Sequence, residues 1–166
     1  MDTNIKISMS KKANQIFLLK NMLEKLDKIY FYNDYDFVIC DCGLILDMTV
    51  LNILMITDLL IAPVKLGGFE VDAINDLKTQ VKNLKEFNPN IKIKGLLTMK
   101  QKNKVTEHIE AFLKDNKEYD MFKTTIMRSV IVEKSTAAFV PLPKFSKNSK
   151  VVRQYKSLVD EILEVL

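Results

Sequence analysis

The stretch Leu59–Met99 decides the fold: LLIAPVKLGGFEVDAINDLKTQVKNLKEFNPNIKIKGLLTM. It begins and ends with nearly continuous apolar runs, Leu59–Val64 and Ile91–Met99, which are typical of strands buried on both faces. Between them, Phe69–Phe87 repeats apolar side chains at the spacing of an amphipathic helix. A strand, a helix and a second strand in this order form a right-handed crossover, so the two strands are predicted to lie parallel in one sheet.

The same alternation of strands and helices extends to both sides of this unit. The sequence therefore predicts a single α/β domain over residues 1–166, with a mostly parallel sheet and helices on both faces. The C-terminal ends of the strands then share one edge of the sheet, where such folds bind ligands. The other predicted elements are the strands Asn4–Ser8, Asp36–Cys42 and Tyr119–Met127, and the helices Lys11–Tyr30 (N-cap Ser10), Met48–Thr57, Val105–Asn116 and Lys150–Leu166, with a loop around Pro141 and Pro143 between the last strand and the last helix.

The composition excludes several classes of protein. With 48% hydrophobic and 28% charged residues among 166, the chain is neither collagen-like nor wholly disordered. The longest apolar run, Met48–Val64, is interrupted by polar residues, and the N-terminus has no signal-peptide pattern. Cys40 and Cys42 are too close for a framework disulfide and too few for a zinc site. We therefore expect a cytoplasmic protein that does not contact a membrane.

Asp41 is the residue with the clearest chemical meaning, because it ends the apolar run Phe37–Cys40. A carboxylate at the C-terminal edge of a sheet is suited to holding the water shell of Mg²⁺ beside a nucleotide phosphate. The alternative is a carboxylate at a strand end that caps the following turn with Gly43. The spacing alone leaves both interpretations open.

The stretch Tyr35–Cys42 (YDFVICDC) resembles the Walker B region of the ParA/Soj-type partition ATPases, relatives of MinD. The resemblance covers nearly the whole chain from about Asn33 onward, and it is the order and spacing of its pieces that are specific. It implies a P-loop NTPase-like, three-layer Rossmann-like fold in which Asp41 is the Walker B acid that binds Mg²⁺ through water. The other matching pieces are Leu51-Asn52, Asp58, Leu60–Val64, Phe69, Asn88-Pro89-Asn90, Ile93–Met99, Phe122–Ile126 and Arg128.

The phosphate-binding loop of this family is missing from the sequence. A P-loop needs a glycine-rich backbone and a lysine, but the chain has no G-x-x-x-x-G-K-[ST] motif, and its four glycines are Gly43, Gly67, Gly68 and Gly95. The likeness thus corresponds to the C-terminal two-thirds of a ParA protein, without the P-loop strand. Complete members use ATP and Mg²⁺; we expect this chain alone to bind neither and not to hydrolyse ATP.

Two groups of residues take possible roles from the resemblance. Arg128 and Ser129 follow the last predicted strand, where the family has a loop beside the nucleotide base. An equally good interpretation is a loop arginine paired with Glu133 or Asp120. No general base or metal site is predicted from the single His108.

Basic residues form the second group, although the net charge is only +4, from 25 basic and 21 acidic residues. Some follow the strand Ile91–Met99, where the family has a loop that contributes to non-specific DNA binding. Others recur every third residue near the C-terminus, where a helix would give them a positive stripe able to track phosphates. A solvated helix face is the alternative. The DNA-binding candidates are Lys100, Lys102, Lys104, Lys147, Lys150 and Arg153, and the C-terminal series also contains Lys144 and Lys156.

The resemblance implies a partition protein for a plasmid or chromosome, which in complete relatives dimerises around ATP, binds DNA non-specifically and responds to a ParB-like partner. Such a protein would associate with the nucleoid in the cytoplasm. Without a neighbouring P-loop strand, Asp36–Cys42 would form an unprotected sheet edge. We therefore expect either a missing N-terminal portion or self-association. The alternative function is a non-catalytic module that regulates or assembles with a full-length ParA-type ATPase.

Overall fold

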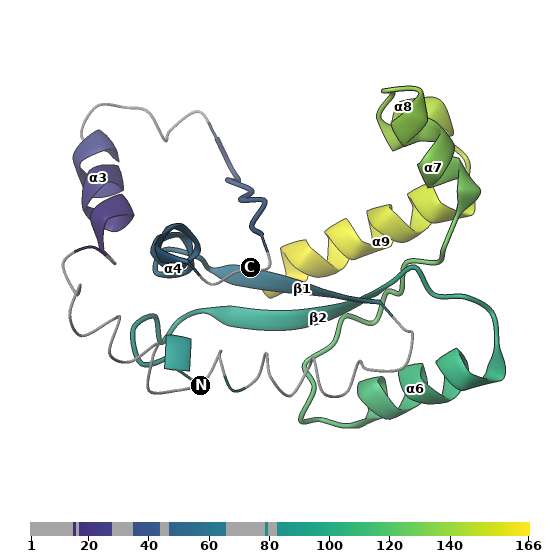
Figure 1. Cartoon of the computed structure of the whole chain (residues 1–166), viewed down its shortest axis with the longest axis horizontal. Helices are drawn as coiled ribbons and strands as arrows, with labels where there is room; N and C mark the ends of the chain where they lie inside the picture. Colours follow the sequence, from purple (N-terminus) through teal and green to yellow (C-terminus); the bar gives the residue numbers. More distant parts are fainter. Residues whose placement is uncertain (1–14, 16, 28–34, 44–46, 66–78, 80–82) are drawn as a thin grey trace. The chain divides into compact units, whose positions relative to one another are not determined.

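The computed structural model describes residues 15, 17–27, 35–43, 47–65, 79 and 83–166 (Figure 1). These divide into two compact units, the first from Met1–Asp58 and Lys82–Ile91, the second from Leu59–Val81 and Lys92–Leu166. The predicted strand Asn4–Ser8, the N-cap Ser10 and most of the predicted helix Phe69–Phe87 lie outside the described residues.

The first unit contains α3 (Leu18–Asp27) and α4 (Met48–Leu54). The carboxylate of Asp47 caps α4 by accepting a hydrogen bond from the backbone N–H of Val50 at 2.9 Å. Both helices were predicted, and α4 is shorter than expected.

Two asparagines hold the first unit together through their amide side chains. The buried Asn52 donates to the backbone oxygens of Gln15 and Met48 and accepts from the N–H of Leu19, so it links α4 to the region of α3. Asn88 donates at 2.9 Å to the carbonyl oxygens of both Leu54 and Thr57, which lie at the end of α4. The two Asn88 bonds satisfy carbonyl oxygens at and just beyond the C-terminal end of α4.

The second unit is built on two parallel strands, β1 (Leu59–Lys65) and β2 (Lys92–Thr98). They pair from Leu59 opposite Lys92 to Lys65 opposite Thr98, as the sequence predicted. Because they are parallel, both strands end at the same edge of the sheet.

The last predicted strand, Tyr119–Met127, is wrong as a continuous strand. This segment runs parallel to β2 but forms only two isolated bridges, Gly95 to Met121 and Lys100 to Met127. Between the bridges, the N–H groups of Lys123 and Thr124 donate at 2.7 Å to the carboxylate of Glu161 instead of to a neighbouring strand. A side chain has thus replaced the strand partner, and the ladder is interrupted there.

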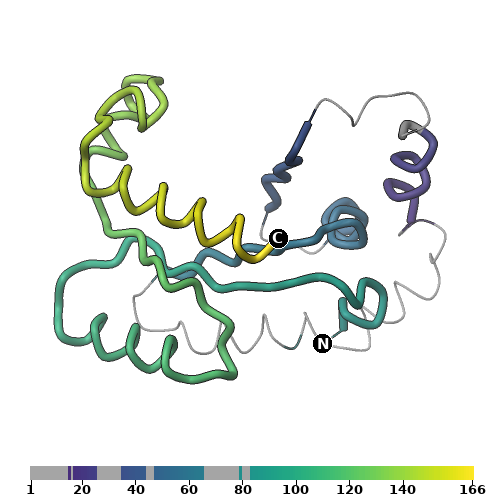
Figure 2. Tube along the Cα trace, turned by 180° about the vertical axis from the view of Figure 1, so that it is seen from behind, coloured from purple at the N-terminus to yellow at the C-terminus, as the bar shows by residue number. Residues whose placement is uncertain are grey.

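The helices of the second unit are α6 (Lys104–Asp115), α7 (Val130–Ala137), α8 (Leu142–Phe145) and α9 (Lys150–Val165). The first turns of α6, α7 and α9 are capped by the side chains of Asn103, Ser129 and Ser149. Figures 1 and 2 show α6 on one side of the strands and α9 on the other. The bounds of α6 and α9 agree with the sequence to within one residue, whereas α7 and α8 were not predicted.

The apolar core of the second unit has two parts, one on each face of the strands. Leu97 packs in one cluster with residues of α6, and Leu96 packs in the other with residues of α9, because successive side chains of a strand point to opposite faces. The α/β layering predicted from the sequence is confirmed in this unit. The first cluster contains Val64, Leu97, Leu113 and Tyr119, and the second contains Leu96, Phe122, Ile126, Val151 and Leu158.

Candidate functional site

The segment that carries Asp41 is exposed and is not a strand. Residues 35–43 have no regular secondary structure, and the side chains of Val38 and Ile39 are 69% and 92% exposed. The predicted strand Asp36–Cys42 is therefore wrong for this structure. A strand needs a hydrogen-bonded neighbour, and no described residue pairs with this segment.

The described residues around Asp41 do not by themselves supply the groups of a triphosphate site. Its side chain is exposed, and no cluster of three or more metal-binding side chains occurs in the described part of the chain. The sequence supplies no glycine-lysine loop to neutralise phosphates. Nearby, partial burial raises the pKa of the Cys42 thiol, and the charges of Cys40, Asp41 and Asp47 raise it further. These residues do not fit ATP and Mg²⁺ by themselves, and we derive no hydrolysis step from them.

Arg128 and Ser129 lie at the C-terminal edge of the sheet in the second unit. The backbone N–H of Arg128 donates to the carbonyl oxygen of Lys100 at 3.0 Å, which places this loop directly beside the end of β2. The guanidinium of Arg128 is 3.6 Å from the carboxylate of Glu133, and both side chains are more than half exposed. Ser129 caps α7 by accepting from the N–H of Ile131 at 3.3 Å. Each residue thus has a structural partner, and an exposed pair of this kind holds the arginine only weakly.

A charge cluster around Glu110 joins α6 to the end of β2. The carboxylate of Glu110 accepts hydrogen bonds from Lys100, from Thr125 and, at 2.8 Å, from Lys114. Lys114 also donates to the carbonyl oxygen of Lys123 at 2.6 Å. Partial burial acts to raise the pKa of Glu110, but the hydrogen bonds from Lys100, Lys114 and Thr125 outweigh it and lower the pKa from 4.5 to about 2.

This cluster gives Lys100 a different environment from the other basic candidates. Its side chain is only 12% exposed, and its ammonium is held by Glu110. Lys102 and Lys104, in contrast, are exposed in the loop before α6 and at its first residue. Of the three candidates after β2, Lys102 and Lys104 are therefore the ones open to an external partner.

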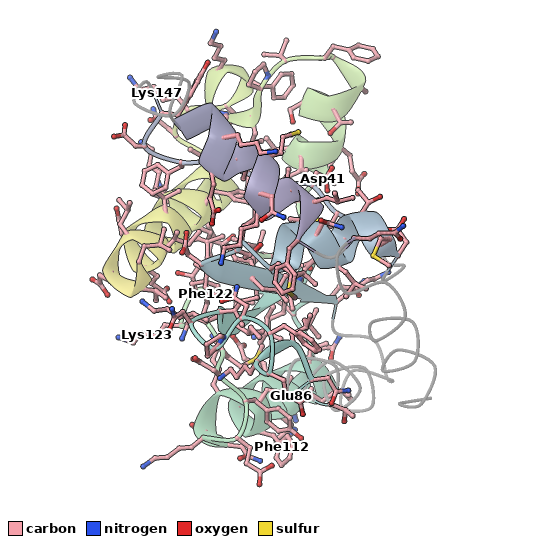
Figure 3. The ribbon with its side chains drawn as sticks, turned by 90° about the vertical axis from the view of Figure 1, so that its left-hand side faces the viewer. Asp41, Glu86, Phe112, Phe122, Lys123 and Lys147 are labelled. Atoms are coloured by element: carbon pink, nitrogen blue, oxygen red, sulfur yellow. The ribbon has the colours of Figure 1, made fainter. Side chains whose placement is uncertain are left out.

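The C-terminal basic residues are exposed but do not form one helical stripe. Lys144 lies in α8, Lys147 lies between α8 and α9, and only Lys150, Arg153 and Lys156 share α9. The stripe expected where this series is helical is therefore limited to the three residues of α9, because the chain turns between the two helices. Figure 3 shows Lys147 on the opposite side of the strands from Phe112 of α6.

A shallow groove beside these residues was not predicted from the sequence. It has a volume of about 550 Å³ and lies between α7, α8 and α9. Phe139 on its wall is 95% exposed and has a positive φ of 54°, a conformation that glycine usually supplies after a helix. The signal in the sequence was Ser129 as a helix cap and Pro141 before a short turn of helix. The groove is lined by Val132, Ser135, Thr136, Phe139, Val140, Pro141, Leu142, Pro143 and Tyr155.

No helix in the described ranges is both long enough and apolar enough to span a membrane.

Comparison with known proteins places this fold in a family. A family model described as an AAA domain matches residues 2–93. The chromosome partitioning protein ParA of Myxococcus xanthus is 23% identical over 169 residues, which cover 98% of this chain and 56% of that protein. The sporulation initiation inhibitor protein Soj of Bacillus subtilis is 25% identical over 151 residues, covering 87% of this chain and 56% of Soj. An uncharacterized protein of Pseudomonas putida is 25% identical over 134 residues, covering 79% of this chain and 51% of the relative.

Solved structures show the same fold. A putative plasmid partition protein from Borrelia burgdorferi B31, bound to AMPPNP, superposes with a TM-score of 0.72 at 22% identity and covers 91% of this chain and 57% of its own. A second plasmid partition protein from Borrelia burgdorferi gives a TM-score of 0.64 at 20% identity, with coverages of 91% and 54%. The chain spans about half the length of the relatives that it matches. The chain belongs to this AAA domain family, in its ParA/Soj-type branch, and its α/β layers are those of the plasmid partition proteins.

Proposed function

We propose that this chain acts in the ATP-dependent partitioning of plasmid or chromosomal DNA and supplies the C-terminal scaffold of a ParA-type protein. The observation that carries the proposal is the likeness to the AMPPNP-bound plasmid partition protein over 91% of the chain. Matches to a chromosome partitioning protein and to Soj along most of the sequence support it. In this proposal Asp41 is the Walker B acid, and Arg128 and Ser129 form the loop on the base side of the nucleotide.

The chain alone does not hydrolyse ATP in this proposal. The sequence lacks the glycine-lysine loop, and Asp41 lies in an exposed segment without a phosphate-binding neighbour among the described residues. Calorimetric titration with ATP and Mg²⁺ tests the point, with Asp41→Asn as the variant. We expect no saturable binding by either protein. Micromolar binding that Asp41→Asn abolishes would show a complete nucleotide site and would contradict the proposal.

Non-specific DNA binding is proposed for Lys102, Lys104, Lys147, Lys150 and Arg153, which are exposed. Lys100 is left out because Glu110 holds its ammonium. Each bound phosphate releases counterions, so the affinity should fall steeply with salt and show no preference for sequence.

The DNA surface is tested by gel mobility shift with two unrelated duplexes over a range of salt. A Lys147→Ala, Lys150→Ala double variant should weaken binding equally for both duplexes, and it should reduce the salt slope by roughly one for each phosphate that the variant no longer binds. The matched control is Lys117→Ala, an exposed lysine just beyond the C-terminal end of α6. Binding that is insensitive to salt, or that depends on sequence, would argue against this surface.

A second function, a non-catalytic module that assembles with a partner, is favoured by the exposed segment Tyr35–Ile39. Tyr35 and Phe37 are 65% and 55% exposed, and the backbone of this segment is not paired with described residues. An exposed apolar segment with an unpaired backbone can add as a strand to a partner's sheet. The occupant would be a further N-terminal portion, a full-length ParA-type ATPase or a second copy.

Two measurements separate the two functions. An in-frame P-loop in the reading frame upstream of Met1 would favour a piece of a partition ATPase, and a stop codon there would favour the module. For the module, Val38→Lys should abolish association with the partner, whereas Val105→Lys on α6 should not.

A fluorescent fusion of the chain tests the proposed location, which is the cytoplasm with enrichment on the nucleoid. A ParB-like protein is the proposed partner to add in that assay.

A further inference from the structure

One edge of the sheet in the second unit is closed by side chains in place of a strand. Residues 121–127, here called the edge segment, run parallel to β2 and bridge it at both ends, from Met121 to Gly95 and from Met127 to Lys100. Among the described residues, no strand pairs with the other side of the edge segment. The backbone groups on that side are the ones to which a further strand would bind.

The N–H groups of the edge segment point to two sides in turn. Phe122 and Ile126 donate to carbonyl oxygens of β2 at 2.9 and 2.8 Å, so their N–H groups face β2. Lys123 and Met127 each come one residue later, and successive residues of an extended chain point in opposite directions. The N–H groups of Lys123 and Met127 therefore face away from β2, toward the outer edge.

Two side chains of α9 accept hydrogen bonds at this outer edge. The carboxylate of Glu161 accepts from the N–H groups of Lys123 and Thr124, one at each oxygen and both at 2.7 Å. The side-chain oxygen of Gln154 accepts from the N–H of Met127 at 3.2 Å. A charged acceptor makes the shorter and stronger hydrogen bond, so Glu161 makes the tighter of the two contacts. We call these three N–H groups the capped amides.

The spacing of the two acceptors on α9 matches the spacing of the donors. Gln154 and Glu161 are seven residues apart, which is about two helical turns, so they lie on one side of α9 and about 10.5 Å apart along its axis. The capped amides are three to four residues apart in an extended segment, which spans roughly 10–13 Å. Leu158, between the two acceptors, packs in the core with Phe122 and Ile126 and holds α9 beside the edge segment.

An outer carbonyl oxygen of the edge segment is occupied as well. Lys114 of α6 donates from its ammonium to the backbone oxygen of Lys123 at 2.6 Å. The carboxylate of Glu110 binds the same ammonium at 2.8 Å, which keeps Lys114 in this position. Both kinds of backbone group that a further strand would need, donors and an acceptor, are thus bound by side chains. An incoming strand would have to displace them.

We propose that α9 is a strap that closes this edge of the sheet, in which Glu161 and Gln154 block the addition of a strand from another chain. Open edges with unpaired N–H and C=O groups are templates for association, and covering them with a helix prevents it. The proposal uses no residue of Tyr35–Ile39 and does not depend on the proposed function. When the two acceptors are removed, α9 keeps its apolar contacts with the core, and the freed edge segment pairs with other copies of the chain.

The first test compares the wild type with a Gln154→Leu, Glu161→Leu variant of the full chain. Leucine favours a helix but accepts no hydrogen bond, and circular dichroism checks that α9 remains folded. Hydrogen exchange of single amides, measured by NMR in dilute solution, should become at least about tenfold faster at the capped amides, as expected when a hydrogen bond to a side chain is lost. The amides of Phe122 and Ile126 are the internal control, because they donate to β2.

Exchange at the two control amides should change by less than about threefold. If all the amides of the edge segment exchange faster by the same factor, the substitutions only destabilise the sheet and the proposal is wrong. Glu161→Gln alone is the milder variant, since glutamine keeps one of the two acceptor oxygens. It should speed exchange at Lys123 or Thr124 and leave Met127 unchanged, and an equal change at Met127 would also contradict the proposal.

The second test asks whether the freed edge associates. The double variant should form assemblies rich in β-sheet at concentrations where the wild type does not, detected by sedimentation velocity and thioflavin T fluorescence. The matched control is Ser157→Leu, Asp160→Leu, which also adds two leucines to α9 and removes one negative charge, but at exposed positions away from the edge segment. This control should behave as the wild type.

Hydrogen exchange locates the contact within the assemblies. The capped amides should be protected again there, because a strand of another copy now binds them. Protection that appears only in other segments, a double variant that associates no more than the wild type, or a control that associates equally would each overturn the proposal.

Discussion

Replacing Glu110 with glutamine removes the charge that neutralises Lys100 and Lys114 between α6 and the end of β2. The carboxylate binds both ammonium groups and the hydroxyl of Thr125. Glutamine keeps the size and some hydrogen bonds of the side chain but loses the charge. The two lysines, whose side chains are 12% and 26% exposed, then keep their charges without a counterion.

The pKa of Glu110 sets the size of the effect. A pKa lowered from 4.5 to about 2 corresponds to roughly 3.4 kcal/mol if the whole shift stabilises the folded state, at about 1.4 kcal/mol for each pKa unit. The carboxylate keeps some contact with water, since the side chain is 18% exposed. Solvent screening therefore reduces the contribution, and we expect roughly 1.5–2 kcal/mol.

The sign of the pH dependence follows from a pKa that is lower in the folded state than in the unfolded state. The contribution of Glu110 is complete above about pH 4.5 and is lost as the pH falls toward about 2. Glu110→Gln should therefore be less stable than the wild type by roughly 1.5–2 kcal/mol at neutral pH. The two proteins should become nearly equal in acid, because a protonated glutamate resembles glutamine.

Urea denaturation of both proteins at several values from neutral to about pH 2, followed by circular dichroism, measures this difference. Comparing the two proteins at each pH cancels the titration of the other carboxylates. Glu107→Gln, an exposed position on the same helix, is the control and should change stability by less than about 0.5 kcal/mol. A difference that stays the same at every pH, or that is absent at neutral pH, would refute the electrostatic reasoning.

Three further predictions concern the packing and the buried hydrogen bonds. Phe122→Ala should lower the free energy of unfolding, measured by urea denaturation, by roughly 3–4 kcal/mol because the ring is fully buried. Phe112 is half exposed, so Phe112→Ala should lower it by less than about 1 kcal/mol. Similar losses for the two variants would contradict a core centred on Phe122. Gly95→Ala should lower the free energy of unfolding by roughly 1 kcal/mol or less, because the new Cβ would meet the flexible end of the Met121 side chain, which can move aside; a loss as large as that of Phe122→Ala would contradict this. Asn52→Ala removes three hydrogen bonds, so it should lower the free energy of unfolding by roughly 1–3 kcal/mol and speed the hydrogen exchange of the Leu19 amide. An unchanged exchange rate at Leu19 would argue against the hydrogen bond between Asn52 and Leu19.

The sequence determined the elements whose signals are local. Apolar runs located β1 and β2 and their parallel order, and the helical repeat of apolar residues located α6 and α9. The family was also readable from the sequence, because the spacing of many short stretches is a property of the chain. The missing glycine-lysine motif, on which the proposed inactivity rests, is likewise a property of the sequence alone.

Tertiary structure decided which backbone and side-chain groups found partners. Glu161, which is far away in the sequence, accepts hydrogen bonds from the N–H groups of Lys123 and Thr124. It therefore interrupts a segment that has the composition of a strand. Glu110 takes the ammonium of Lys100, which sequence spacing had grouped with the exposed lysines after β2. Strand pairing and ion pairing depend on what lies opposite a residue in space, and the local pattern of a sequence does not contain that information.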